Sequence, residues 1–354
     1  MGGRKHLSGS FAEKRVQFNG HSDAMQALWP RPLVDGSGRA VDVEVEDLTI
    51  PAPSSSSSAA SSDSNSPNNI PLRIYKPRNI DKAEANSSSS SPLPIIVWYH
   101  GGGWMAGTLD SEHAQCRLVA AGVPAVVVGV GYGPLPENST GGMLADCLAG
   151  FEWAWGNAAS LGGGGGGDDD AAKGKGKGKV LVLGGSAGGA LACGVVRQLA
   201  LKGEEARCGG AVGVFPVTVR PERLPERWAA LHTSYGELWD EAPVVRGPDQ
   251  REVLDLAAER SPEDPLLAVK FMYEEETLRK FPRTYIATAG KDLMRDDGVV
   301  LEAALRDAGV QVKRAHYEGL PHYFWFFPQL GGKTMGFVED LVKGVRWVLA
   351  EGDS

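Results

Sequence analysis

Residues 180–189 read Val-Leu-Val-Leu-Gly-Gly-Ser-Ala-Gly-Gly. The apolar half predicts a strand buried on both faces, as in a parallel sheet, and the small residues from Ala190 to Lys202 predict the helix that follows. The pattern G-x-S-x-G marks the turn between them, where glycines permit close approach and the serine hydroxyl is held clear of the sheet. Free N–H groups at the helix N-terminus suit a serine whose attack creates an oxyanion. We therefore predict that Ser186 is a nucleophile; the alternative is a glycine-rich surface loop.

The bulk composition narrows the class of protein. The chain has 354 residues, enough for one large α/β domain, and its formal net charge of −8 argues against nucleic acid as a partner. Its four cysteines lack C-x-x-C spacing, so we expect buried thiols in a reducing compartment and no metal site. The N-terminus has no apolar core of signal-peptide length, and no apolar run is long enough to cross a bilayer. These features predict a cytoplasmic protein.

Predicted strands and helices alternate along the chain, which indicates an α/β protein with a mainly parallel sheet. We expect a single domain over residues 1–354. The stretches 51–69, 81–92 and 161–179 are dominated by small and polar residues and are expected to be disordered or flexible inserts. A weak amphipathic helix is expected from Phe18 to Trp29, closed by the prolines that follow.

Two segments depart from this alternation. Val41 to Ile50 alternates apolar and acidic residues and is predicted to pair with Ile70 to Lys76 as an antiparallel hairpin. Residues 217–281 contain recurring prolines and short helical pieces between two predicted strands. Because this segment is too long for a plain loop, we predict that it forms a lid.

A serine nucleophile needs a base and an acid that orients the base. His322 follows the last predicted strand, which places it at the carboxyl edge of the sheet beside Ser186. Asp292 is nearest the end of the preceding strand and is the predicted acid. Asp296 or Asp297 is the alternative acid, although both suit the first turn of a helix. The alternative for His322 is a structural role in the aromatic cluster that follows it.

The developing oxyanion needs N–H donors. We predict the amides of Gly102, Gly103 and Ala187, because glycines let a carbonyl approach closely and Ala187 follows the nucleophile. His100 is expected to hold the glycine loop rather than to catalyse. The predicted pocket wall is aromatic and apolar. It consists of Trp104, Tyr323, Phe324 and the lid residues Trp228, Leu231 and Trp239. The alternative for the aromatic residues 323–327 is burial in the core.

Together these motifs resemble the hormone-sensitive-lipase-like carboxylesterases, the fold-3 family of α/β-hydrolases, over about residues 93–350. The nucleophile, acid and histidine occur in the family's order of serine, acid, histidine. The segments that carry the resemblance are H-G-G-G-W at 100–104, Tyr132 to Glu137 for Y-R-L-A-P-E, Gly184 to Gly189 for G-D-S-A-G-G, Asp292 for the acid of D-x-L-x-D and His322 for the histidine of H-x-F. The departures from the family pattern are Gly185 for Asp, Leu293 for Pro, and Gly133 and Pro134 for Arg and Leu.

The resemblance implies an α/β-hydrolase fold with a mainly parallel eight-stranded sheet and a lid built from residues 1–40 together with 217–281. It also implies a serine carboxylesterase that hydrolyses short- to medium-chain acyl esters through an acyl-enzyme, with no cofactor and no metal. The expected partner is a small acyl ester, and a homodimer is compatible with the sequence. Two alternatives stay open: an amide or formamide hydrolase or secondary-metabolite deacetylase, and a non-catalytic small-molecule receptor on the same scaffold, against which His322 argues.

Overall fold

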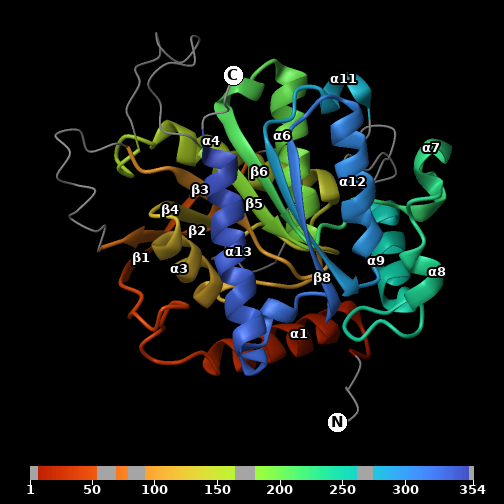
Figure 1. The fold of residues 1–354 in the computed structure, drawn as a ribbon, viewed down its shortest axis with the longest axis horizontal. Helices are drawn as coiled ribbons and strands as arrows, with labels where there is room; N and C mark the ends of the chain where they lie inside the picture. The colour runs from red at the N-terminus through yellow and green to blue at the C-terminus, as the bar shows by residue number, and fades with distance from the viewer. Residues whose placement is uncertain (1–6, 54–68, 79–91, 164–179, 261–273, 351–354) are drawn as a thin grey trace.

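An eight-stranded sheet runs through the computed structural model in the order β1-β2-β4-β3-β5-β6-β7-β8 (Figure 1). The strands are β1 (Val43–Pro51), β2 (Asn69–Pro77), β3 (Ile95–Tyr99), β4 (Val126–Val130), β5 (Val180–Gly185), β6 (Cys208–Val214), β7 (Thr284–Lys291) and β8 (Val312–Pro321). Only β1, β2 and β4 pair antiparallel; β4, β3, β5, β6, β7 and β8 pair parallel. The predicted α/β fold with a mostly parallel eight-stranded sheet is confirmed, and so is the predicted hairpin of β1 with β2.

The structure describes residues 7–53, 69–78, 92–163, 180–260 and 274–350. Most of the three predicted inserts (residues 54–68, 81–91 and 164–179) and part of the predicted lid (261–273) lie outside the described residues.

Helices cover both faces of the sheet and its carboxyl edge. They are α1 (Phe11–Ala27), α3 (His113–Gly122), α4 (Thr140–Gly156), α6 (Ala187–Lys202), α7 (Glu226–Ala229), α8 (Ser234–Leu238), α9 (Gly247–Arg260), α11 (Glu275–Leu278), α12 (Arg295–Asp307) and α13 (Gly332–Leu349). Within the described part of the chain, none of these helices is both long enough and apolar enough to cross a membrane. All four cysteines are free and buried, as the sequence predicts.

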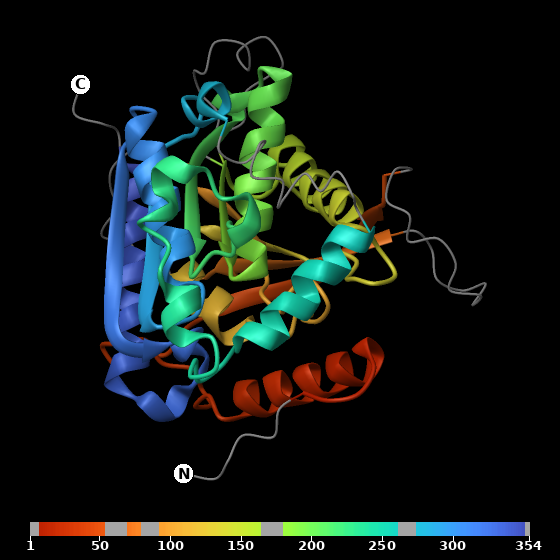
Figure 2. The same cartoon turned by 90° about the vertical axis from the view of Figure 1, so that its right-hand side faces the viewer.

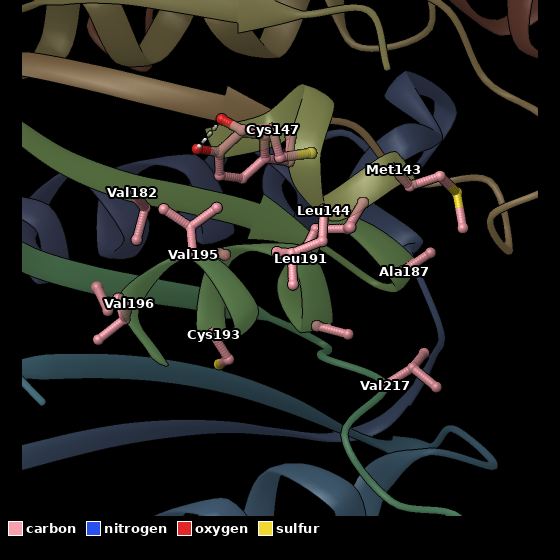
Figure 3. Close-up of a cluster of buried hydrophobic side chains, with 14 of the residues drawn as sticks. Met143, Leu144, Cys147, Val182, Ala187, Leu191, Cys193, Val195, Val196 and Val217 are labelled. Atoms are coloured by element: carbon pink, nitrogen blue, oxygen red, sulfur yellow. Dashed lines mark hydrogen bonds between the residues drawn. The ribbon is translucent and has the colours of Figure 1, made fainter. Parts of the chain in front are cut away.

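The sheet separates the core into two clusters, one on each face. The side chains of strand β5 alternate between the two faces and so belong to both clusters. Val180 and Val182 belong to the cluster that includes α4, α6 and α12, whereas Leu181 and Leu183 belong to the cluster that includes α3 and α13. Figure 3 shows Val182 of β5 beside Val195 of α6 in the first cluster. Each fully buried aliphatic side chain contributes about 1.5–3 kcal/mol to folding, so the sheet holds α6 firmly.

Two predicted helix starts are wrong by several residues. The N-terminal helix begins at Phe11 rather than Phe18, because Ser10 and Glu13 form a capping box in which each side chain accepts from the other's backbone N–H. Helix α6 begins at Ala187 rather than Ala190, directly after Ser186. Its first residues are glycines and alanines, which carry little apolar periodicity, so the pattern starts later than the helix.

Helix α1 lies across the carboxyl edge of the sheet, alongside α9 (Figure 2). The Lys14 ammonium contacts the Glu252 carboxylate of α9 at 2.6 Å, and Arg15 Nε donates to the carbonyl of Met105 at 2.6 Å. Asn19 Oδ1 accepts from the Gly107 amide at 3.0 Å. Two segments far apart in the sequence, α1 and α9, therefore lie next to each other above the strand ends.

The turn from β5 into α6 depends on the absence of side chains. A Cβ on Gly188 would overlap the backbone carbonyl oxygens of Tyr99 and His100, and a Cβ on Gly184 would overlap the carbonyl of Gly188. These obstacles are backbone atoms, which cannot rotate away, so α6 can start under β3 only with glycine at both positions.

We expect Gly188→Ala to lower the free energy of unfolding by about 3 kcal/mol or more, because the added methyl forces α6 away from β3. Gly336→Ala in α13, where a Cβ meets nothing within 4 Å, is the matched control and should stabilise by about 0.5–1 kcal/mol. Urea unfolding monitored by circular dichroism measures both. Equal stabilities for the two variants would contradict the packing argument.

Candidate active site

Ser186 lies at the top of the β5–α6 turn with a positive φ of 53° and ψ of −119°. Such a backbone is strained for a residue other than glycine and persists only where neighbouring structure holds it. Here the Ser186 amide donates to the carbonyl of Val214 at 2.9 Å, and its own carbonyl accepts from the amides of Gly189 at 2.9 Å and Val217 at 3.2 Å. These bonds to β6, to the loop after it and to the first turn of α6 hold the backbone of Ser186 in this conformation.

The structure brings the three residues of the predicted triad together from the loops after β5, β7 and β8. His322 Nε2 lies 2.9 Å from Ser186 Oγ, and His322 Nδ1 lies 2.7 Å from Asp292 Oδ2. Asp292 is fully buried, and its other oxygen accepts from the Met294 amide at 2.9 Å. The arrangement is consistent with a catalytic triad.

A buried carboxylate at Nδ1 determines which form the imidazole takes. With the proton of His322 on Nδ1, facing Asp292, the lone pair of Nε2 faces the Ser186 hydroxyl and can accept its proton. The same carboxylate stabilises the imidazolium that forms after the transfer. The geometry can therefore activate Ser186 as a nucleophile, which is the role we assign to it below.

The alternative acids, Asp296 and Asp297, bind the segment between β6 and β7 instead. Asp297 Oδ2 accepts from the amides of Thr218 and Val219 at 2.9 and 3.0 Å, and its Oδ1 lies 2.9 Å from His232 Nε2. Asp296 Oδ2 accepts from backbone amides at the start of α8. Both carboxylates belong to the first turn of α12, as the sequence predicts, and Asp292 is the one that reaches His322.

The loop of residues 101–107, which we call the glycine loop, follows β3 and faces Ser186. Gly102 and Gly103 have positive φ values of 131° and 60°, which glycine adopts without strain. Within the described chain, no residue accepts a hydrogen bond from the amides of Gly102, Gly103 or Ala187. Three N–H groups near the Ser186 hydroxyl are thus available to a ligand, and their assignment as oxyanion donors stays a prediction.

The contacts of His100 are with the glycine loop and with Tyr132, which indicates a structural role. Its Nδ1 lies 2.8 Å from the carbonyl of Gly101, and its ring stacks on Tyr132, whose hydroxyl donates to the His100 carbonyl at 2.8 Å. Burial lowers the pKa of His100 to about 4. The neutral ring therefore acts as a fixed structural donor, in agreement with the expected role.

A cavity of about 560 Å³ opens above these groups. Ser186 and His322 line it together with the glycine loop, and its remaining wall is mostly apolar. That wall includes Phe18 and Met25 of α1, Val244 and Val245 before α9, Val253 of α9 and Phe327. A volume of this size suits a small-molecule ligand of drug-like dimensions.

The structure places some of the residues of the predicted pocket wall at the cavity and others away from it. Trp104 and Tyr323 line the cavity, but Phe324 does not, since its ring is fully buried against Phe337 of α13. Trp228, Leu231 and Trp239 also lie away from the cavity. The apolar residues of α1 and α9 take their place. The capping box at Ser10 could have indicated from the sequence where α1 begins. The resemblance implied that residues 1–40 and 217–281 form one lid, but it did not say which residues of α1 and α9 line the cavity.

No group of three or more His, Cys, Asp or Glu side chains in the described ranges could hold a metal ion.

Comparison with known proteins gives a consistent result. Residues 96–326 match the α/β-hydrolase fold family. The chain is 33% identical to a versiconal hemiacetal acetate esterase of Dothistroma septosporum, over 99% of this chain and 92% of that protein. It is 29% identical to the carboxylesterase NlhH of Mycobacterium tuberculosis, over 72% and 70% of the two chains. The solved structure of vibralactone cyclase covers 99% of this chain and 92% of its own with a TM-score of 0.78, and its 21% identity shows the fold alone.

We expect Asp292→Asn to slow covalent labelling of Ser186 by a fluorophosphonate about 100-fold or more, because an amide at this position favours the wrong tautomer of His322. Asp296→Asn is the matched control, since Asp296 binds the start of α8 rather than His322. Its labelling rate should stay within about threefold of wild type. Labelling followed by intact-mass spectrometry measures both rates. Similar rates for the two variants would argue against Asp292 as the orienting acid.

Proposed function

The chain belongs to the fold-3 family of α/β-hydrolases and is a carboxylesterase of its hormone-sensitive-lipase-like group, and from this we propose that it removes a short acyl group, acetyl first of all, from a bulky apolar alcohol. The observation that carries the proposal is the hydrogen-bonded chain from Asp292 through His322 to Ser186 at the floor of a largely apolar cavity. A relative that matches nearly the whole chain bears the name of an acetate esterase, which supports acetate as the acyl group.

In the acylation step, Ser186 Oγ bonds to the ester carbonyl carbon while His322 Nε2 takes the hydroxyl proton. The carbonyl oxygen becomes an oxyanion that accepts hydrogen bonds from the amides of Gly102, Gly103 and Ala187. When the oxyanion collapses, the bond to the alcohol oxygen breaks, and the imidazolium of His322 gives that oxygen its proton. The alcohol leaves and the acyl group stays on Ser186.

In the second step, water replaces the alcohol. His322 takes a proton from the water as its oxygen bonds to the acyl carbon, and the same amides hold the second oxyanion. Collapse returns the proton to Ser186 Oγ and releases the carboxylic acid. Asp292 keeps the proton of His322 Nδ1 in place through both steps and is not itself protonated.

The size and lining of the cavity support a bulky apolar alcohol. A cavity of about 560 Å³ far exceeds what an acetyl group fills, and residues of α1 and α9 line part of it. Apolar surface buried there contributes about 25 cal/mol for each Å² removed from water. An alcohol of two or three fused rings therefore gains more from this cavity than a short alkyl alcohol does.

We also propose that α1 and the described part of residues 217–281 form the lid over this cavity. The ion pair of Lys14 with Glu252 joins α1 to α9, and Asp297 ties residues 218 and 219 to the start of α12. Further hydrogen bonds, from Arg15 to the Met105 carbonyl and from the Gly107 amide to Asn19, hold α1 over the glycine loop. Opening of this lid would therefore have to break these bonds as well as the ion pair.

We expect the wild-type protein to hydrolyse 1-naphthyl acetate with a kcat/KM at least tenfold above that for 1-naphthyl octanoate, and Ser186→Ala to lose both activities. Initial rates across the acyl series, with N-(1-naphthyl)acetamide as the matching amide, provide the measurement. Faster turnover of the amide would favour the amide-hydrolase alternative. No turnover of any substrate would favour the receptor alternative, and activity that survives in Ser186→Ala would exclude Ser186 as the nucleophile.

A second prediction concerns the alcohol site. Val253→Trp should raise KM for 1-naphthyl acetate about tenfold and leave KM for ethyl acetate within about twofold, since the larger ring fills only the space beneath the lid. Val16→Trp is the matched control, because Val16 belongs to α1 but is 73% exposed. Steady-state kinetics with both esters distinguish the two variants. An equal rise in KM for both esters would place the alcohol elsewhere.

A further inference from the structure

Glu112 is a buried carboxylate beside the glycine loop, and the mechanism above does not use it. Its side chain is 2% exposed. Oε1 accepts from the amide of Gly101 at 2.7 Å and from the hydroxyl of Tyr323 at 2.8 Å, and Oε2 accepts from Trp98 Nε1 at 2.6 Å. All three partners are donors, so the carboxylate fits its surroundings as an acceptor only.

The two donors on Oε1 come from different sides of the site. Gly101 immediately precedes the predicted oxyanion donors Gly102 and Gly103. Tyr323 immediately follows His322 and has a positive φ of 54°, which directs its side chain back toward the glycine loop. One oxygen of Glu112 therefore joins the loop that follows β3 to the loop that follows β8.

Tyr323 also touches the turn that carries the nucleophile. A Cβ on Gly185, the residue before Ser186, would overlap the Tyr323 hydroxyl, and a Cβ on Gly101 would meet the same oxygen. The fold-3 motif has Asp where this chain has Gly185. In this chain the phenol occupies the space that any side chain at position 185 would need, so Gly185 and Tyr323 fit only as a pair.

The burial of the Glu112 carboxylate makes the positions of its hydrogen-bond donors costly to change. Burial raises the pKa of Glu112, and the hydrogen bonds from Gly101, Trp98 and Tyr323 oppose that rise. Within the described chain, no cation forms an ion pair with Glu112. A buried carboxylate that loses one of its few donors is left partly unsatisfied, which makes the positions of those donors costly to change.

We propose that Glu112 and Tyr323 are positioning residues for ester hydrolysis, which hold the glycine loop, the Ser186 turn and the His322 loop at fixed separations through one shared oxygen. The inference rests on the proposed roles of Ser186 and the oxyanion amides. It predicts that these two side chains affect the transition state more than substrate binding, because an oxyanion hydrogen bond strengthens as charge develops.

Tyr323→Phe tests the bridge with the smallest change, since it removes one hydroxyl and keeps the ring. We expect kcat for 1-naphthyl acetate to fall about tenfold with KM within about twofold, a smaller loss than direct removal of an oxyanion donor causes. The inhibition constant of an aryl trifluoromethyl ketone, which forms an oxyanion on Ser186, should rise by the same factor. Glu112→Leu, which removes both acceptor oxygens and keeps a side chain of similar size, should do likewise.

Trp98→Phe is the matched control. It removes the hydrogen bond at the other oxygen of Glu112, which leaves the link between Gly101 and Tyr323 in place. This variant should melt at a lower temperature and keep kcat within about twofold of wild type. The double variant Glu112→Leu with Tyr323→Phe should lose no more activity than the worse single variant, because both changes break one bridge.

If Ser186→Ala is inactive, any of three results would overturn the inference. They are an unchanged kcat in Tyr323→Phe, an unchanged inhibition constant of the ketone for Tyr323→Phe, and a loss of kcat in Trp98→Phe equal to that in Tyr323→Phe. Activity that survives in Ser186→Ala would instead reject the proposed nucleophile, so the two failures are distinguishable. A thermal melt of each variant shows whether it is folded at the assay temperature, so that only folded proteins are compared.

Discussion

The backbone contact between the start of α6 and the end of β3 is the constraint on which the rest of the structure depends. Gly188 lies so close to the carbonyls of Tyr99 and His100 that no side chain fits. This contact places the start of α6 against the end of β3, and Ser186, Ala187, Gly102 and Gly103 line the same cavity. A packing restriction in the core thus determines the geometry of the chemistry.

The sequence was sufficient for those features that follow from strand order and short motifs. Parallel strands end at one edge, so loops after β5, β7 and β8 had to meet, and Ser186, Asp292 and His322 were found without any knowledge of contacts. Asp292 could be preferred over Asp296 and Asp297 because it is nearest the strand end. These inferences succeed because the positions of the three side chains depend on backbone topology rather than on the packing of any particular side chain.

Other features depend on packing between distant segments, and the sequence did not reveal them. Phe324 and Tyr323 are neighbours in an aromatic run, yet Phe324 packs on α13 and Tyr323 faces the cavity. The positive φ of Tyr323 turns its side chain away from the direction that Phe324 takes. A tyrosine rarely adopts such a backbone conformation, so the sequence gives no reason to expect it there. In the same way, the pairing of α1 with α9 depends on single contacts such as Lys14 with Glu252, which have no periodicity to detect.

Three buried carboxylates perform the same physical task at the carboxyl edge. Asp292 orients His322, Asp297 holds the amides of residues 218 and 219, and Glu112 joins Gly101 to Tyr323. Each is costly to bury and is satisfied only by donors in one arrangement, so each selects a single conformation for a loop that would otherwise have many. Apolar contacts are non-directional, so they specify the position of a loop less sharply than these hydrogen bonds do. The site therefore combines close backbone packing at Gly188 with buried acids that each fix one loop.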